Sequence, residues 1–257
     1  MHVVPQQGRP VRASALVALA CALACTPALA EAGQSNSLRD RLFQQRRTTE
    51  TQQPVRYETQ SDMGFVLDQA GSRRLIRFEG SSEIWALTPQ AGPRGDVFYK
   101  NDIGQTVLRQ SRTGGMTLYT PGQPAGMPVA AAGRGEALRP QVVSYADLFR
   151  QVVRVGERVR RALGHPVSLH VDVEESSTAA TLAADALTLA GEALAFTARA
   201  ANTRSRAVSV RSVRVEQGNR PDVERRGNQI LVTINPALGV AGRPSSARIT
   251  RAIVQAA

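Results

Sequence analysis

The chain has 257 residues, with 32 Lys and Arg against 21 Asp and Glu, and only two cysteines. This length suffices to bury one well-filled core or two small ones. Both cysteines, Cys21 and Cys25, fall in the first thirty residues, so the rest of the chain excludes disulfides, thiol catalysis and thiolate metal sites.

The first thirty residues predict an export signal that is removed. Arg9 and Arg12 precede the apolar run ASALVALACALAC, and PALA before Glu31 supplies the small residues of a cleavage site. The run is too short for an ordinary membrane-spanning helix, and we expect no transmembrane helix after signal removal. Cleavage there predicts a periplasmic or secreted protein. The alternative is a lipid-anchored protein, attached through Cys21 or Cys25.

Residues 31–55 predict a flexible tether, because TTETQQP has no apolar periodicity and polar segments of this kind bury too little surface to order. Residues 56–121 then predict an antiparallel β-meander of five or six strands. Short apolar β segments alternate with the reversal signals NDIG and TGG. We expect its core to include Phe65, Phe78, Trp85 and Leu108. Residues 122–140, rich in Pro, Gly and Ala, predict a connector without regular structure.

Residues 141–257 predict an α/β subdomain with the order α-β-α-β-β-α. A helix over 144–163 follows from valine and leucine at helical spacing, with Ser144 as its cap and Gly164 as its stop. The strictly alternating strand PVSLHVDV comes next, and an alanine-rich helix with Leu182, Leu189 and Phe196 on its apolar face follows it.

Two strands near 206–216 and 229–234 flank the polar loop GNRPDVERRGN, and a last helix from Ser245 turns Ile249 and Ile253 inward. The β-α-β portion predicts parallel strands joined by a right-handed crossover. The fold class is therefore α+β, with an N-terminal antiparallel β-meander and a C-terminal α-β-α-β-β-α half.

The blocks FVLD, LIRFEGSSEIWALTP, RGDVFYKND, VLRQSRTGGMTLYTP and VTINPALGVAGRPSS carry a family resemblance. Through them, residues 56–257 resemble an exported bacterial family of alphaproteobacterial type, a domain of unknown function. The resemblance implies export and a bacterial source, and it supplies no catalytic or ligand-binding residue.

Three patterns carry candidate chemistry. His170, Asp172 and Glu174 alternate, so they share one face of a strand and suggest a zinc or manganese site of a metal-dependent hydrolase. The same alternation is typical of a strand whose valines are buried and whose polar residues face solvent.

Glu79 and Glu83 resemble a glycosidase carboxylate pair in their spacing, and we interpret them as surface charges. Lys100 beside Asn101 predicts the end of a strand at a hairpin rather than a reactive amine.

Basic residues form two clusters. Arg150, Arg154, Arg158 and Arg161 line one side of the predicted helix over 144–163, away from its valines. The second cluster comprises Arg204, Arg206, Arg211 and Arg214. Guanidinium groups suit phosphates and carboxylates, although both clusters also fit solvated faces.

The sequence therefore favours a non-catalytic binding or interaction protein over an enzyme, with no cofactor. Because the first thirty residues hold two arginines and no acid, the remaining chain has 30 basic and 21 acidic residues. An anionic envelope component or another periplasmic protein is the expected partner. Nucleic acid is not expected, because the chain shows no aromatic RNA-binding pattern, helix-turn-helix or zinc spacing.

Overall fold

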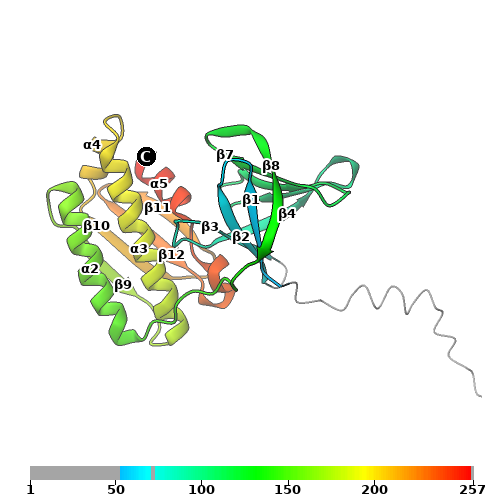
Figure 1. The fold of residues 1–257 in the computed structure, drawn as a ribbon. Helices are drawn as coiled ribbons and strands as arrows, with labels where there is room; N and C mark the ends of the chain where they lie inside the picture. Colours follow the sequence, from blue (N-terminus) through cyan, green and yellow to red (C-terminus); the bar gives the residue numbers. More distant parts are fainter. Residues whose placement is uncertain (1–52, 71–72, 256–257) are drawn as a thin grey trace, which may run out of the picture. The chain divides into compact units, whose positions relative to one another are not determined.

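The structure is a computed structural model that describes residues 53–70 and 73–255 (Figure 1). The predicted export signal and residues 31–52 of the predicted tether lie outside these residues. The described residues all belong to one compact unit of the chain. They form a β-barrel followed by a layer of helices on a four-stranded sheet, which confirms the α+β class.

Eight antiparallel strands pair in chain order and close into a barrel, because β1 pairs with both β2 and β8. They are β1 (Val55–Thr59), β2 (Gly64–Ala70), β3 (Arg73–Phe78), β4 (Trp85–Ala91), β5 (Val97–Lys100), β6 (Thr106–Gln110), β7 (Met116–Thr120) and β8 (Gln123–Arg134). A short 3-10 helix, η1 (Pro93–Gly95), joins β4 to β5. The meander order agrees with the sequence prediction. The predicted number of strands, five or six, is too low, and the prediction did not include the closure of the strands into a barrel.

The predicted connector over 122–140 is wrong for residues 123–134, which form β8, the longest strand of the barrel. Its prolines are tolerated because of where they lie. β1 pairs with β8 only from Val129 to Arg134, whereas Pro128 and Pro124 lie in the part of β8 that faces β7 alone. The missing N–H of each proline therefore costs little. Only Met127 and Val129 of β8 pack against the core, which explains the weak hydrophobic signal.

Side chains fill the inside of the barrel. Phe65, Ile76, Leu87, Leu108 and Leu118 are fully buried in one cluster. An aromatic row runs along one side of this cluster, from Tyr57 through Phe65 and Phe78 to Trp85, with ring centroids 5.4–6.0 Å apart. An eight-stranded barrel is just wide enough for side chains to fill, so this interior is a core.

The chain after the barrel forms helices and a mixed sheet. Its elements are α2 (Tyr145–Leu163), β9 (Ser168–Asp172), α3 (Ser177–Arg199), α4 (Arg204–Val208), β10 (Ser212–Gln217), β11 (Asp222–Arg226), β12 (Gln229–Ile234), the 3-10 helix η2 (Pro236–Gly242) and α5 (Ser246–Val254). The strand order is β11-β12-β10-β9. β9, β10 and β12 run parallel, and β11 runs antiparallel to β12.

Local signals placed the first helix well and the region after α3 poorly. Ser144 caps α2 by accepting from the N–H of Asp147, and Gly164 ends it in the left-handed conformation at φ 82°, as predicted. The strand predicted from 206 begins only at Ser212, because residues 204–208 form α4. The predicted polar loop contains β11, whose charged residues hide its strand character.

The three long helices form one layer on one face of the sheet. α2 lies against β9, α3 against β10 and β12, and α5 against β11 and β12, while α3 contacts both other helices (Figure 1). α3 has 23 residues and is apolar enough to cross a membrane by length and composition alone. Most of it is buried here, including Leu182 and Leu189 as predicted, so α3 is the central helix of this core.

One buried arginine joins the barrel to the helical half. Arg243 follows η2, and only 2% of its side chain is exposed. Its Nε donates to Asp185 of α3, its Nη2 donates to the carbonyl oxygen of Ile84 at 3.0 Å, and its Nη1 lies 3.8 Å from Glu83. Glu83 is itself 7% exposed, so the expectation that it is a surface charge is wrong. A guanidinium at this depth requires such partners.

The residues after Arg243 bind two barrel loops, the β3–β4 loop that holds Glu83 and the β5–β6 turn that holds Asp102. Ser245 donates from its N–H at 2.8 Å and from its hydroxyl at 2.5 Å to Asp102. Ser246 donates from its N–H at 2.8 Å and from its hydroxyl at 2.5 Å to Glu83. Two carboxylates thus receive the first N–H groups of α5, where the helix dipole favours negative charge. We name the cluster Glu83, Asp102, Asp185, Arg243, Ser245 and Ser246 the Arg243 junction.

Arg243→Ala should lower the free energy of unfolding by about 3–5 kcal/mol, because it leaves two acids without their buried cation. The control is Arg248→Ala, which removes an ion pair to Asp222 whose side chains are 33% and 60% exposed and should cost about 1 kcal/mol or less. Urea unfolding followed by tryptophan fluorescence measures both changes. Equal, small losses in the two variants would show that the junction is unimportant for stability.

Candidate functional site

The predicted basic stripe on α2 does not act as one surface. Arg150, Arg154, Arg158 and Arg161 are all exposed, as predicted. Arg150 forms an ion pair with Asp147, and Arg154 donates to Gln151 one turn earlier at 2.7 Å. The guanidinium groups of both residues therefore have partners on α2 itself. The other two arginines lie nearer the C-terminal end of the helix and have a different neighbourhood.

Arg158 and Arg161 line a groove of about 740 Å³ between α2, α3 and the start of α4. Arg199, the last residue of α3, and Arg204, the first residue of α4, line it as well. Nη1 of Arg204 donates to the carbonyl oxygen of Ala198 at 3.3 Å, and Nε of Arg161 donates to the carbonyl oxygen of Glu157 at 3.4 Å. Four guanidinium groups thus surround one opening.

The floor of this groove is apolar. Phe196 is 66% exposed there, which corrects the expectation that it faces the core with Leu182 and Leu189. The alanines Ala162, Ala195 and Ala198 complete the lining. The groove therefore places an exposed phenyl ring beside four arginine side chains. We call Arg158, Arg161, Arg199 and Arg204, with Phe196 and Glu192, the arginine groove.

Glu192 is the one acid in the lining of the arginine groove. Its carboxylate lies 3.5 Å from Nη1 of Arg158, and about half of each side chain is exposed. Partial burial raises the pKa of Glu192 above that of an ordinary glutamate, and Arg158 opposes this shift. Nearby Glu83 and Asp185 also raise it. The acid is therefore more readily protonated than a surface glutamate.

The second predicted basic cluster spreads over different sites. Arg204 belongs to the arginine groove, while Arg211 lies beside His165, with Nη1 2.6 Å from Nε2 of the ring. Arg214 is on β10, with its guanidinium 3.7 Å from Asp172. Proximity in the sequence therefore does not predict a shared surface here, because α4 ends at Val208, before Arg211, and Arg214 belongs to β10.

The suggested metal ligands do not gather around one point. His170 and Asp172 are exposed on β9, and Glu174 is exposed just after it. Among residues 53–70 and 73–255, no group of three or more His, Asp or Glu side chains lies close enough to hold a metal ion. The exposed positions alternate with half-buried Leu169, Val171 and Val173, which pack on the core.

Lys100 ends β5, and the turn after it is held by Asn101. The side-chain oxygen of Asn101 accepts from the N–H groups of Ile103 at 3.2 Å and Gln105 at 2.9 Å. Gly104 supplies the left-handed conformation at φ 82°. The prediction of a strand end at a hairpin is confirmed.

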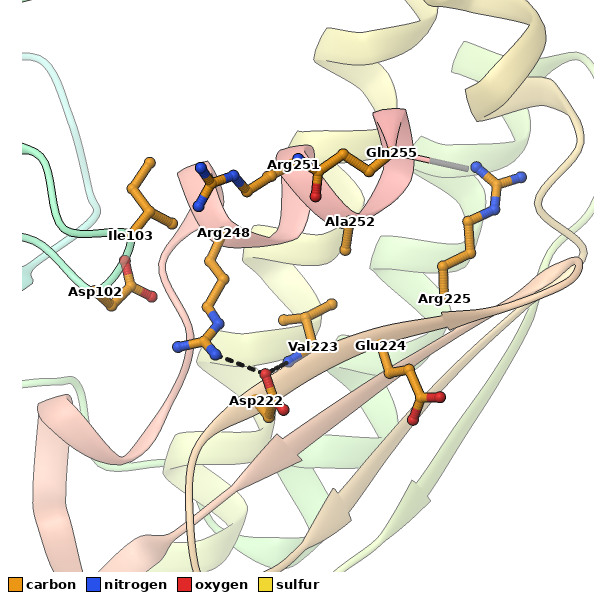
Figure 2. Close-up of a pocket in the computed structure, with 10 residues that line it drawn as sticks. All are labelled: Asp102, Ile103, Asp222, Val223, Glu224, Arg225, Arg248, Arg251, Ala252 and Gln255. Carbon is orange, nitrogen blue, oxygen red and sulfur yellow. Dashed lines mark hydrogen bonds and ion pairs between the residues drawn. The ribbon is translucent and has the colours of Figure 1, made fainter. Parts of the chain in front are cut away.

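A second cavity, of about 460 Å³, lies between the β5–β6 turn, β11 and α5 (Figure 2). Its charged side chains are largely occupied within the protein. Arg248 donates to Asp222 at 2.7 Å, and Arg225 binds the carbonyl oxygen of Ile253 at the end of α5. Asp102 accepts from Ser245. The arginine groove, with more cations and an apolar floor, is therefore the stronger candidate for binding a ligand.

Comparison with known proteins gives a family and no activity. No curated protein and no solved structure matches the chain. The family's sequence profile matches residues 37–253, which include the barrel, the Arg243 junction and the arginine groove. The chain belongs to the family described as domain of unknown function DUF4908.

Proposed function

We propose that this protein is an exported, non-catalytic binding module of the bacterial envelope that holds an anionic amphiphile in the arginine groove. The observation that carries the proposal is the placement of four arginines around one exposed phenyl ring. Only one carboxylate lines the same opening, so the local charge is strongly positive. Such a site concentrates anions near the surface.

The two parts of the arginine groove favour an anionic lipid over a hydrophilic polyanion. Guanidinium groups bind phosphate and carboxylate oxygens with directed, charge-assisted hydrogen bonds. Phe196 and the alanine floor offer apolar contact to acyl carbon atoms. A charged polysaccharide would use the arginines alone, whereas a phospholipid head with its first acyl carbons would use both.

Export is part of this proposal. Residues 1–30 have the charge, apolar run and small-residue end of a signal, and they lie outside the described residues. A periplasmic or secreted location would bring the arginine groove to anionic lipids and polymers of the envelope. Anchoring through Cys21 or Cys25 is the alternative, and it would hold the protein at the membrane permanently.

Arg158→Gln combined with Arg161→Gln should weaken binding to vesicles of phosphatidylglycerol in phosphatidylcholine. At about 1 kcal/mol for each arginine near an anionic surface, we expect roughly 30-fold weaker binding at low salt. The matched control, Arg150→Gln with Arg160→Gln, removes the same charge from exposed positions outside the groove. Vesicle co-sedimentation measures both.

Equal losses in the two double variants would mean that overall charge, rather than the groove, determines binding.

Phe196→Ser distinguishes an anionic lipid from a charged polysaccharide as the ligand. It should weaken binding to vesicles while leaving retention on a sulfated dextran resin unchanged. If the variant bound vesicles as well as the natural protein, the apolar residues of the groove would have no part in binding.

Binding to the same vesicles should strengthen as pH falls from 7 toward the ordinary glutamate pKa of about 4.3. The raised pKa of Glu192 means that this acid is protonated at a higher pH than other glutamates, which leaves Arg158 uncompensated. Glu192→Gln should bind more tightly than the natural protein at pH 7 and should lose most of this pH dependence. An unchanged pH profile in the variant would exclude Glu192 as its source.

Intact-mass analysis of protein recovered from the envelope of producing cells should show a chain that begins at Glu31. A diacylglyceryl group on Cys21 or Cys25 would give a larger mass and would support the anchored alternative. An uncleaved chain confined to the cytosol would contradict export in either form.

A further inference from the structure

The sheet of the helical half ends at a strand, β9, that has no second strand partner in the described part of the chain. β9 pairs there with β10 alone. The N–H of Ser168 donates to the carbonyl oxygen of Arg211 at 2.9 Å, so Ser168, His170 and Asp172 direct their backbone groups toward β10. Successive residues of a strand alternate in this direction. The N–H and C=O groups of Leu169 and Val171 therefore point outward from the sheet.

An exposed apolar stripe runs along α2 on the same side. Phe149 and Val153 are 59% and 66% exposed, and they lie one helical turn apart. Gly156 comes three residues later, and a Cβ placed on it would lie 3.8 Å from Leu169 of β9. The other flank of α2 faces α3, where Arg158 meets Glu192. The stripe thus borders β9 and not the arginine groove.

The opposite edge of the sheet is protected. Four of the five residues of β11 are charged, namely Asp222, Glu224, Arg225 and Arg226. α5 packs against this strand, and Arg248 binds Asp222. Charged side chains and a covering helix are the usual means of preventing edge pairing. β9 carries a single carboxylate, Asp172, against four charged residues in β11, and the α2 residues Phe149 and Val153 beside it are apolar.

The sequence of β9 is complementary to itself. In antiparallel pairing centred on His170, Leu169 faces Val171 of a second copy, and these outward-pointing residues exchange backbone hydrogen bonds. On the other face Ser168 lies opposite Asp172 of the second copy, so a hydroxyl donor meets a carboxylate. His170 lies diagonal to the same carboxylate, within the reach of cross-strand pairs. This complementarity of polar groups favours a second copy over an unrelated strand.

We propose that the protein forms a two-fold symmetric dimer in which β9 pairs with β9 of a second copy and the Phe149–Val153 stripes of both α2 helices pack together. The sheets of the two copies then join into one sheet of eight strands. Both arginine grooves stay open, so the dimer does not depend on the proposed function.

Molar mass in solution tests the dimer. The full chain with Cys21 and Cys25 replaced by serine should have twice the mass of one chain by light scattering. Val153→Glu places two carboxylates in the apolar contact of each dimer and should raise the dimer dissociation constant by about 100-fold or more. Because Val153 is exposed within one copy, this variant should keep its fold, as judged by circular dichroism.

Cysteine cross-linking tests the register. His170→Cys in the same background should form an intermolecular disulfide, because residues 170 of the two copies form a non-hydrogen-bonded pair with Cα atoms about 4.5 Å apart. The control Glu224→Cys, exposed on the other edge strand, should not. A monomer at concentrations up to about 100 μM would overturn the proposal. So would cross-linking through residue 224 instead of 170, or a dimer indifferent to Val153→Glu.

Discussion

A buried cation lies at the contact between the two halves of this fold and binds groups from both. The side chain of Arg243 contacts Asp185 of α3, Glu83 and the backbone of Ile84, so that one guanidinium satisfies groups from both the barrel and the helical half. Ser245 and Ser246 then bind Asp102 and Glu83 with the first N–H groups of α5. Val240 adds an apolar contact with Ile84 and Leu138 beside them. The start of α5 is therefore fixed by barrel residues, and α5 in turn packs against α3.

The arginine groove depends indirectly on the contact between the two halves, through α3. Its cations come from α2, the end of α3 and the start of α4, so its shape follows the packing of α2 on α3. That packing is close because Gly191 of α3 faces Val155, where an added Cβ would lie 2.8 Å from the valine. Asp185, two turns before Glu192 on α3, binds Arg243 and also raises the pKa of Glu192. Junction and groove thus share one helix and one electrostatic environment.

Local signals in the sequence predicted elements that are self-contained. α2 has a cap, a stop and regular valine spacing, and its bounds agree with the prediction. β8 lacks these signals, since its alanines, glycines and prolines form a strand only because β7 and β1 lie on either side. Glu83 resembles a surface charge until Arg243, 160 residues later, comes into contact with it. Arg158 and Arg161 were identifiable on α2, but Arg199 and Arg204 join them only through tertiary packing. Phe196 fits the helical spacing of the core, yet lies just outside the buried face.

The closure of the barrel by its first and last strands has a consequence for the order of folding. β1 cannot complete its hydrogen bonds until β8 exists, because β8 is its second neighbour in the barrel. Pairings between distant parts of a chain form slowly, because the intervening segment loses conformational entropy before the new contacts stabilise the pairing. A polypeptide that emerges amino end first therefore carries β1 as an open edge through most of barrel synthesis. Partners that shield such edges would act during this interval, before residue 134 has emerged.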